Sequence, residues 1–281
     1  MRAVLRSLER KPREEAMRAG ARWLRWLDRA APRLRRVALR NLELAMPGAA
    51  PESIIDGCFA SLGRVLAAVA HFPRITRANV DEWILYEGFE HFEQARARGR
   101  GVLFATGHLG NWELSAFAHA LMTAPMSFVV RPLDNPLLDA MATQYRELSG
   151  NRVLGRRDFL RALVEALRRN EAAGILIDQN VTADRGVFID FFGRKACVDA
   201  GFARLAHRTG AAVIPGFALW DAAAQRHTLK FYPPVPMTGD ALADTQAVHA
   251  VLEQAIREHP EQWLWIHRRW KTRPEGEAPL Y

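Results

Sequence analysis

Segments typical of β-strands alternate with segments typical of α-helices from about residue 84 onward. Short apolar runs at 101–106 and 174–178 are typical of strands buried on both faces. Amphipathic stretches of helical length separate the runs, which favours parallel pairing. The pattern predicts an α/β fold with a mainly parallel central sheet flanked by helices. We expect strands at 101–106, 127–130, near 153, and at 174–178, 212–217 and 227–232 (the last antiparallel), and helices at 51–72, 111–122, 136–148, 157–170, 199–209 and 241–258.

The N-terminal segment carries the positive charge of the chain. Residues 1–50 hold 13 of the 39 Lys and Arg but only 5 of the 31 Asp and Glu, so the remainder is balanced. Arginines recur every three or four positions from 22 to 40, with Trp and Leu between them and Pro32 interrupting the helix. Such a helix suits an anionic membrane surface, or it packs on the domain with a solvated basic face. We therefore divide the chain into a basic amphipathic helical region, 1–80, and an α/β domain, 81–281.

Composition and motifs exclude several classes of protein. A chain that is 49% hydrophobic and 25% charged is an ordinary globular protein. Its two cysteines form no metal-binding pattern, and no nucleic-acid motif follows the basic segment. The motifs of ATP, dinucleotide, serine-hydrolase and zinc-protease sites are absent. No uncharged run reaches the roughly 20 residues of a spanning helix, and no signal peptide is visible. We expect a protein of the cytosol or of the cytosolic membrane face.

The stretch GHLGNWE, residues 107–113, places a histidine and a glutamate five positions apart, with one glycine before the histidine and a second between the two. On a continuous helix these side chains would diverge by about 140°. If the stretch is instead a strand, a turn and a helix with Asn111 as N-cap, the His108 ring can fold back toward Glu113. A carboxylate on one imidazole nitrogen would make His108 a general base. The alternative is a structural turn with a capping asparagine.

Polar groups follow three of the expected strands: His108, Arg131, and the pair Asp178-Gln179. Ligand sites in parallel sheets lie at the carboxyl ends of the strands, so these groups are candidates for one site. Arg131 could equally form a structural ion pair, and Asp178 could cap the loop that follows it.

Several blocks of the chain resemble one known family. G-H-x-G-N-W-E, VVRPLDNPLLD at 129–139, GILIDQNVTADRGVFIDFFGRKA at 174–196, TGAAVIPGF at 209–217 and PEQWLWIHRRWKTRP at 260–274 resemble, in this order, the late acyltransferases of lipid A biosynthesis. These enzymes share a fold with glycerol-phosphate and lysophospholipid acyltransferases. The resemblance covers about residues 35–274. It implies transfer of a fatty acyl group from acyl carrier protein or coenzyme A to a hydroxyl of a lipid acceptor such as a lipid A precursor, without a bound cofactor or metal.

The resemblance also implies roles for individual residues. His108 would deprotonate the acceptor hydroxyl, and Glu113 would orient and polarise the histidine. The helix start at Asn111 and the guanidinium of Arg131 are candidates to stabilise the oxyanion. Asp178 and Gln179 would line the acceptor side. The acyl channel would be walled in part by Phe191, Phe192 and Gly193.

The chain departs from the family in two places. The N-terminal region is basic and amphipathic where the family has an apolar anchor, so we expect a peripheral protein on the cytoplasmic face of the bacterial inner membrane. Cys197 and Asp199 stand where small or hydroxyl residues are common. The acceptor could therefore be another glycolipid, an aminolipid or a lysophospholipid. From a different class, the chain could be a non-catalytic membrane-binding protein that kept the fold.

Overall fold

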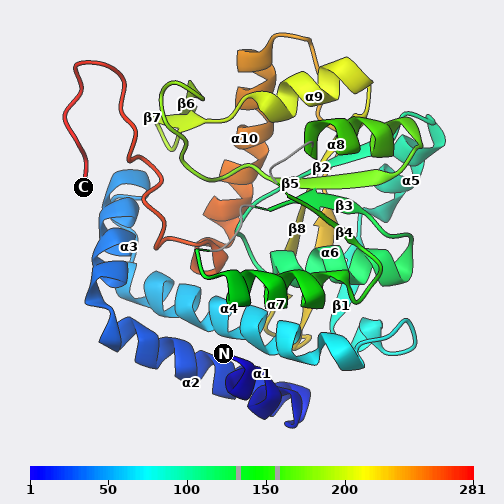
Figure 1. The fold of residues 1–281 in the computed structure, drawn as a ribbon. Coiled ribbons are helices and arrows are strands. Elements are labelled where there is room, and N and C mark those ends of the chain that lie inside the picture. The colour runs from blue at the N-terminus through cyan, green and yellow to red at the C-terminus, as the bar shows by residue number, and fades with distance from the viewer. Residues whose placement is uncertain (131–133, 156–158) are drawn as a thin grey trace.

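The computed structural model describes residues 1–130, 134–155 and 159–281 (Figure 1). Within these ranges the strands form a seven-stranded sheet of order β1-β9-β8-β2-β5-β3-β4. The predicted α/β class with a mainly parallel sheet is confirmed. The strands of this sheet are β1 (Ile84–Glu87), β2 (Val102–Thr106), β3 (Ser127–Val129), β4 (Arg152–Leu154), β5 (Ala172–Leu176), β8 (Ala212–Asp221) and β9 (Arg226–Phe231).

Strands β2 and β5 are neighbours in the interior of the sheet. The two strands run parallel and in register, ending at Thr106 opposite Leu176. The backbone N–H of Ile177 still bonds to the carbonyl of Thr106, and there the ladder ends. The strand predicted at 174–178 therefore stops earlier, because Asp178 turns out of the sheet. β9 pairs antiparallel with β8, as predicted, and also parallel with β1.

Helices cover both faces of the sheet. Along β2, Leu103 and Ala105 join the core on the side of α8, α9 and α10, whereas Val102 and Phe104 join the core on the side of α5 and α6. This alternation is what a strand buried on both faces produces. The helices of this domain are α5 (Phe89–Ala97), α6 (Trp112–Met122), α7 (Pro136–Glu147), α8 (Phe159–Arg168), α9 (Gly201–Thr209) and α10 (Ala241–Glu258), with short 3₁₀ turns η1 (Phe72–Arg74), η2 (Val80–Glu82) and η3 (Pro260–Gln262).

Four helices precede the sheet: α1 (Arg2–Glu9), α2 (Arg13–Ala30), α3 (Pro32–Ala45) and α4 (Pro51–His71). The break predicted at Pro32 is confirmed. Helices α2 and α4 cross at Gly20 and Gly63, where a Cβ on Gly20 would lie 2.3 Å from the Gly63 carbonyl oxygen. Helix α2 therefore packs tightly on α4, while part of α2 stays exposed.

Helix α4 with its extension is long and apolar enough to span a membrane by length and composition alone, over Pro51–Arg74. The uncharged run of the sequence does not reveal this candidate, because Asp56 and Arg64 interrupt it. In the structure 56% of its most apolar window is buried, and α4 packs against α1, α2 and α6. Its apolar residues thus serve as core.

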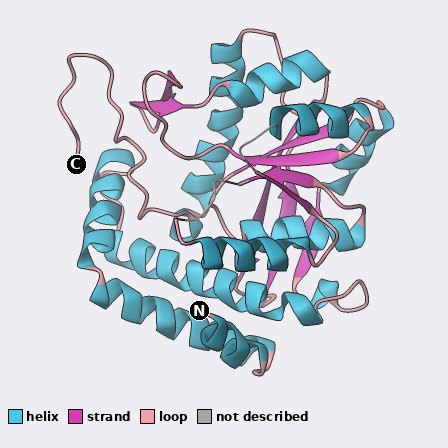
Figure 2. Ribbon diagram, viewed as in Figure 1, coloured by secondary structure: helices cyan, strands magenta, loops and turns pink. Residues whose placement is uncertain are grey.

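An antiparallel hairpin that the sequence did not predict consists of β6 (Val187–Phe191) and β7 (Arg194–Val198). Figure 2 shows it apart from the main sheet. Phe192 and Gly193 make its turn with positive φ values of 54° and 69°. The hairpin belongs to the segment that joins β5 to α9.

Candidate active site

The chain turns sharply between β2 and α6, and Gly110 permits the turn. Gly110 has a φ of +67°, and a Cβ on it would lie 2.0 Å from the Ala218 carbonyl oxygen of β8. Asn111 follows as the N-cap of α6, as predicted, and its side chain accepts a hydrogen bond from the N–H of Leu114 at 3.1 Å. The loop that carries His108 is therefore held against the sheet.

His108 is hydrogen-bonded to Asp178. Its Nδ1 lies 2.8 Å from Asp178 Oδ1, and its backbone N–H donates to Asp178 Oδ2 at 2.8 Å. The indole N–H of Trp263 donates to the same Oδ2 at 2.9 Å. The cause is the strand register: β2 and β5 end side by side, and His108 and Asp178 each stand two residues beyond the last pair.

Burial and charge set the protonation of this pair. Burial lowers the pKa of His108, but the charge and hydrogen bond of Asp178 outweigh it, so the pKa of His108 lies above its usual value. Burial raises the pKa of Asp178, yet His108 and Trp263 together bring it well below its usual range. Asp178 is therefore a carboxylate at neutral pH, able to stabilise a protonated His108.

Glu113 occupies a different position from the one predicted. The carboxylate on the imidazole is Asp178, and Glu113 instead receives two hydrogen bonds from the guanidinium of Arg146 on α7, at 2.5 and 2.9 Å. The predicted fold-back of His108 onto Glu113 is thus corrected. The physical reason is that Glu113 projects from the first turn of α6 toward α7, where a planar guanidinium can bind both carboxylate oxygens. Glu113 acts on His108 only as a nearby negative charge.

The other imidazole nitrogen, Nε2, is the atom of His108 that can take part in proton transfer. With Nδ1 held as donor to Asp178, Nε2 carries a lone pair that can accept a proton. Gln179 Nε2 lies 3.5 Å from it, and the Trp112 ring packs against the imidazole at 4.9 Å between centroids. The His108 side chain is 16% exposed, so Nε2 can be reached while Asp178 is sealed from water.

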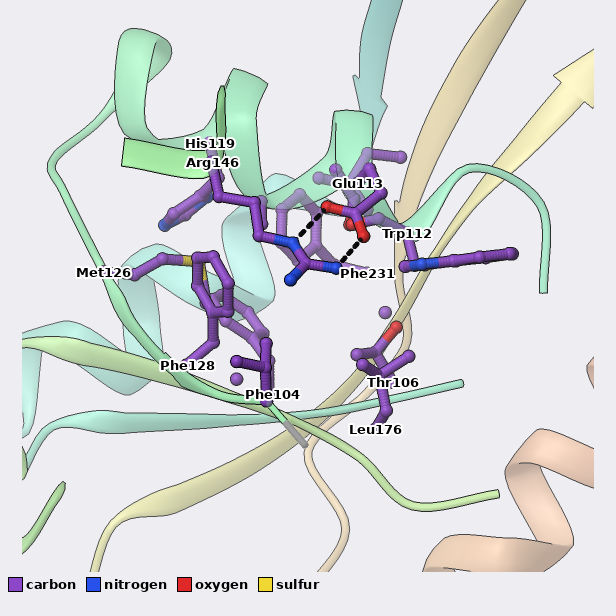
Figure 3. A pocket seen from close by; sticks show the side chains of 16 residues that line it. Phe104, Thr106, Trp112, Glu113, His119, Met126, Phe128, Arg146, Leu176 and Phe231 are labelled. Atoms are coloured by element: carbon purple, nitrogen blue, oxygen red, sulfur yellow. Dashed lines mark hydrogen bonds and ion pairs between the residues drawn. The ribbon is translucent and has the colours of Figure 1, made fainter. Parts of the chain in front are cut away.

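A cavity of about 650 Å³ lies beside Glu113 and Arg146, between the sheet and α6 (Figure 3). Its walls are mainly apolar, and its glycines Gly174 and Gly216 leave room at the sheet. Figure 3 shows the Arg146–Glu113 pair as the charged group of this cavity, with Thr106 and Trp112 nearby. The Trp112 ring also packs against the imidazole of His108. The other labelled side chains that line it are Phe104, His119, Met126, Phe128, Leu176 and Phe231.

The comparisons with known proteins point to one family. The family model described as bacterial lipid A biosynthesis acyltransferase matches residues 1–272. The chain belongs to this family. It is 32% identical over 262 residues to the lipid A biosynthesis palmitoleoyltransferase of Escherichia coli (90% of this chain, 84% of the relative). It is 27% identical over 257 residues to a lipid A biosynthesis acyltransferase of Haemophilus influenzae (90% and 80%).

A third relative extends the range of acceptors. The phosphatidylinositol mannoside acyltransferase of Mycobacterium tuberculosis is 29% identical over 231 residues, which is 80% of this chain and 72% of the relative. The protein is thus an acyltransferase by family.

Three predicted site residues of this acyltransferase lie away from the cavity. Phe191 and Phe192 do not line it; they are buried against Trp263, at 5.9 and 6.4 Å between ring centroids, and Gly193 completes the hairpin turn. The acyl-channel role that the family resemblance implies for these residues is therefore not supported by their position. These residues support Trp263, and through it Asp178. Arg131 lies outside the described residues.

Two residues of the site were missed from the sequence. Arg146 gives no local signal, since it is one of many arginines on predicted helices. Trp263 lies in a matching block, but only the folded chain brings its indole to Asp178. Among the described residues no group of three or more His, Cys, Asp and Glu is placed to hold a metal ion.

Proposed function

We propose that this acyltransferase moves a fatty acyl group from an acyl carrier protein or coenzyme A thioester to a hydroxyl group of a lipid A-type acceptor. The observation that carries the proposal is the His108–Asp178 pair, whose imidazole packs against Trp112 in the wall of a mainly apolar cavity. The family membership and the printed names of the relatives support the acceptor class.

In the proposed mechanism, neutral His108 takes the proton of the acceptor hydroxyl at Nε2. The oxygen attacks the thioester carbonyl, a C–O bond forms, and the C–S bond breaks. The departing sulfur receives the proton from His108. Asp178 holds Nδ1–H and stabilises the imidazolium between the two transfers, so no covalent protein intermediate is needed.

Glu113 takes a different part in this proposal from the one first expected. It binds Arg146 and so holds a guanidinium in the wall of the apolar cavity. That position suits a cation facing the thioester carbonyl, where negative charge develops. Backbone N–H groups at the start of α6 and the side chain of Arg131 remain further candidates for the oxyanion.

The apolar cavity fits the acyl chain of the donor. Phe104, Phe128 and Phe231 offer the chain a surface without hydrogen-bonding groups. Because Trp112 lines the cavity and also packs against the imidazole of His108, a chain in this cavity would place its carbonyl near the imidazole.

The first test is acyl transfer by His108→Ala, assayed with acyl carrier protein and coenzyme A donors and a panel of lipid acceptors read by mass spectrometry. General-base catalysis contributes roughly 10²–10⁴-fold, and kcat should fall by that factor. His91→Ala on α5, remote from the site, is the control. Wild-type turnover in His108→Ala would overturn the mechanism. Transfer to mannosides rather than lipid A precursors would favour the acceptor class of the mycobacterial relative.

We further propose that α2 binds the anionic surface of the inner membrane from the cytoplasmic side. Trp23, Trp26 and Leu27 are 47%, 64% and 39% exposed on a helix that also carries Arg22 and Arg25. Such aromatic residues beside arginines suit the headgroup region.

Co-sedimentation with vesicles that contain anionic lipid measures this binding. Trp23→Ser/Trp26→Ser should weaken sedimentation with them by about tenfold or more, since burying one large apolar side chain contributes roughly 1.5–3 kcal/mol. Leu148→Ser/Leu242→Ser removes two exposed leucines elsewhere and should bind normally. Equal binding by both double variants would contradict the proposal.

A further inference from the structure

A second, larger cavity lies across the sheet from the apolar one, between β5, α8 and α9. Its empty space is about 1,390 Å³. Leu176 of β5 lines both cavities. Gln179, which lies 3.5 Å from His108 Nε2, lines the second. The two cavities therefore adjoin the same end of β5, and Gln179 connects the wall of the second cavity to the nitrogen of His108 that takes the proton.

The walls of the second cavity combine an apolar surface with two cations. Its apolar side chains come from α8, β5 and α9, and include Leu160, Leu163, Ile175, Phe202 and Leu205. Arg204 and Arg208 line it from α9, one helical turn apart, and both are exposed. In the described part of the chain neither arginine forms an ion pair with a carboxylate, unlike many arginines of this protein.

The carboxylate at this cavity is bonded to the backbone and not to either arginine. Asp199 also lines it, and its carboxylate accepts a hydrogen bond from the backbone N–H of Gly201 at 2.7 Å. Arg204 and Arg208 carry like charges at a spacing where side chains are neighbours, an arrangement that disfavours the free helix. An anion bound between the two guanidinium groups would remove that repulsion.

We propose that this cavity binds the acceptor, an anionic amphiphile whose phosphate lies on Arg204 and Arg208 and whose apolar part lies against α8 and β5. The proposal rests on the acyl transfer proposed above and identifies the chemistry of the acceptor. The donor's carrier arm is polar and has little to gain from so much apolar wall. An acceptor lipid carries both chains and charge, and it would reach His108 past Gln179 with its hydroxyl leading.

The experiment compares Arg204→Gln/Arg208→Gln with wild type on two acceptors, a phosphorylated lipid A precursor and its dephosphorylated counterpart, in mixed micelles. The KM of the variant for the phosphorylated acceptor should rise by about tenfold or more, because charge-assisted hydrogen bonds to phosphate are lost. Its kcat, its KM for the donor and its KM for the dephosphorylated acceptor should remain near the wild-type values.

Arg161→Gln/Arg168→Gln on α8 is the matched control. It removes the same charge from the neighbouring helix, and neither residue lines the cavity. Wild-type kinetics in both double variants would overturn the proposal, as would a rise in donor KM alone, which would assign the arginines to the donor's phosphate.

Equilibrium binding of the phosphorylated acceptor without donor separates this proposal from the proposed function. Binding that depends on Arg204 and Arg208, in a protein that transfers no acyl group, would leave the cavity assignment standing and remove the acyl transfer. If the protein transfers the acyl group but its binding of the acceptor does not depend on Arg204 and Arg208, the acyl transfer stands and the cavity assignment is wrong.

Discussion

The two carboxylates near His108 differ in what neutralises them. Asp178 is 3% exposed and receives hydrogen bonds from the imidazole, a backbone N–H and an indole. Glu113 is 15% exposed and is bound by a permanently charged guanidinium. The charge of Asp178 is therefore available to a proton arriving on His108, whereas that of Glu113 is already compensated. Distance in the sequence misleads here: the partner of His108 lies 70 residues away, not five.

The largest effect should come from Asp178→Asn. The amide cannot stabilise the imidazolium and favours the wrong tautomer, so kcat should fall by roughly 10²–10⁴-fold. The pH dependence of kcat/KM shows the direction of the effect on the pKa of His108. His108 works as a neutral base, and its raised pKa places the acidic limb of kcat/KM above the usual histidine value. Removing the carboxylate lowers that pKa, so the limb should move to lower pH.

Asp184→Asn, an exposed aspartate in the segment after β5, is the control for Asp178→Asn and should behave as wild type. An acidic limb that stays in place after Asp178→Asn would show that the two carboxylates do not differ as described.

Glu113→Gln should have a smaller effect of another kind. It leaves the Arg146 guanidinium uncompensated in an apolar cavity, which should destabilise the fold by about 2 kcal/mol, below the range for a fully buried pair because both side chains retain some exposure. We expect kcat to fall roughly 10- to 100-fold, with the acidic limb moving less than in Asp178→Asn.

The double variant Glu113→Gln/Arg146→Met sharpens the comparison. It removes both charges, and thermal unfolding should show stability returning toward wild type while activity stays low. Recovery of activity together with stability would mean that the ion pair is structural only.

The smallest effect should follow a change in the wall of the apolar cavity. Gly216 has a backbone that accepts a side chain, and a Cβ there would meet nothing closer than 3.7 Å. Gly216→Ala and then Gly216→Val should shift the preferred donor stepwise to shorter acyl chains, by a few-fold in kcat/KM per step. Competition between donors of different length measures it. If these variants altered the pH profile, the wall of the apolar cavity and the His108–Asp178 pair would not act separately.

The fold was largely predictable because its signals are local. Buried strands, the break at Pro32 and the Asn111 cap each follow from a few neighbouring residues. The hairpin of β6 and β7 was not predicted, because the residues of these strands follow a loop and show no clear alternation of apolar and polar side chains. The resemblance alone implied a channel role for Phe191 and Phe192, which lie in the core.

The site was predictable only in part because its key contacts cross the sheet. His108 was found from its position at a strand end. Assigning Asp178 as its partner needed the pairing of β2 with β5, in which Thr106 faces Leu176. Neither Arg146 nor Trp263 could be placed, since their partners depend on how α7 and the C-terminal segment pack.

Leu176 forms a wall common to two cavities, and this has a kinetic consequence. If donor and acceptor enter from opposite faces of one strand, neither must leave before the other binds, and both are present when the acyl group moves. Initial-rate plots against one substrate at fixed levels of the other should then intersect, as for a sequential reaction. Parallel lines would instead signal an acylated enzyme, for which His108, bound to Asp178, has no assigned role.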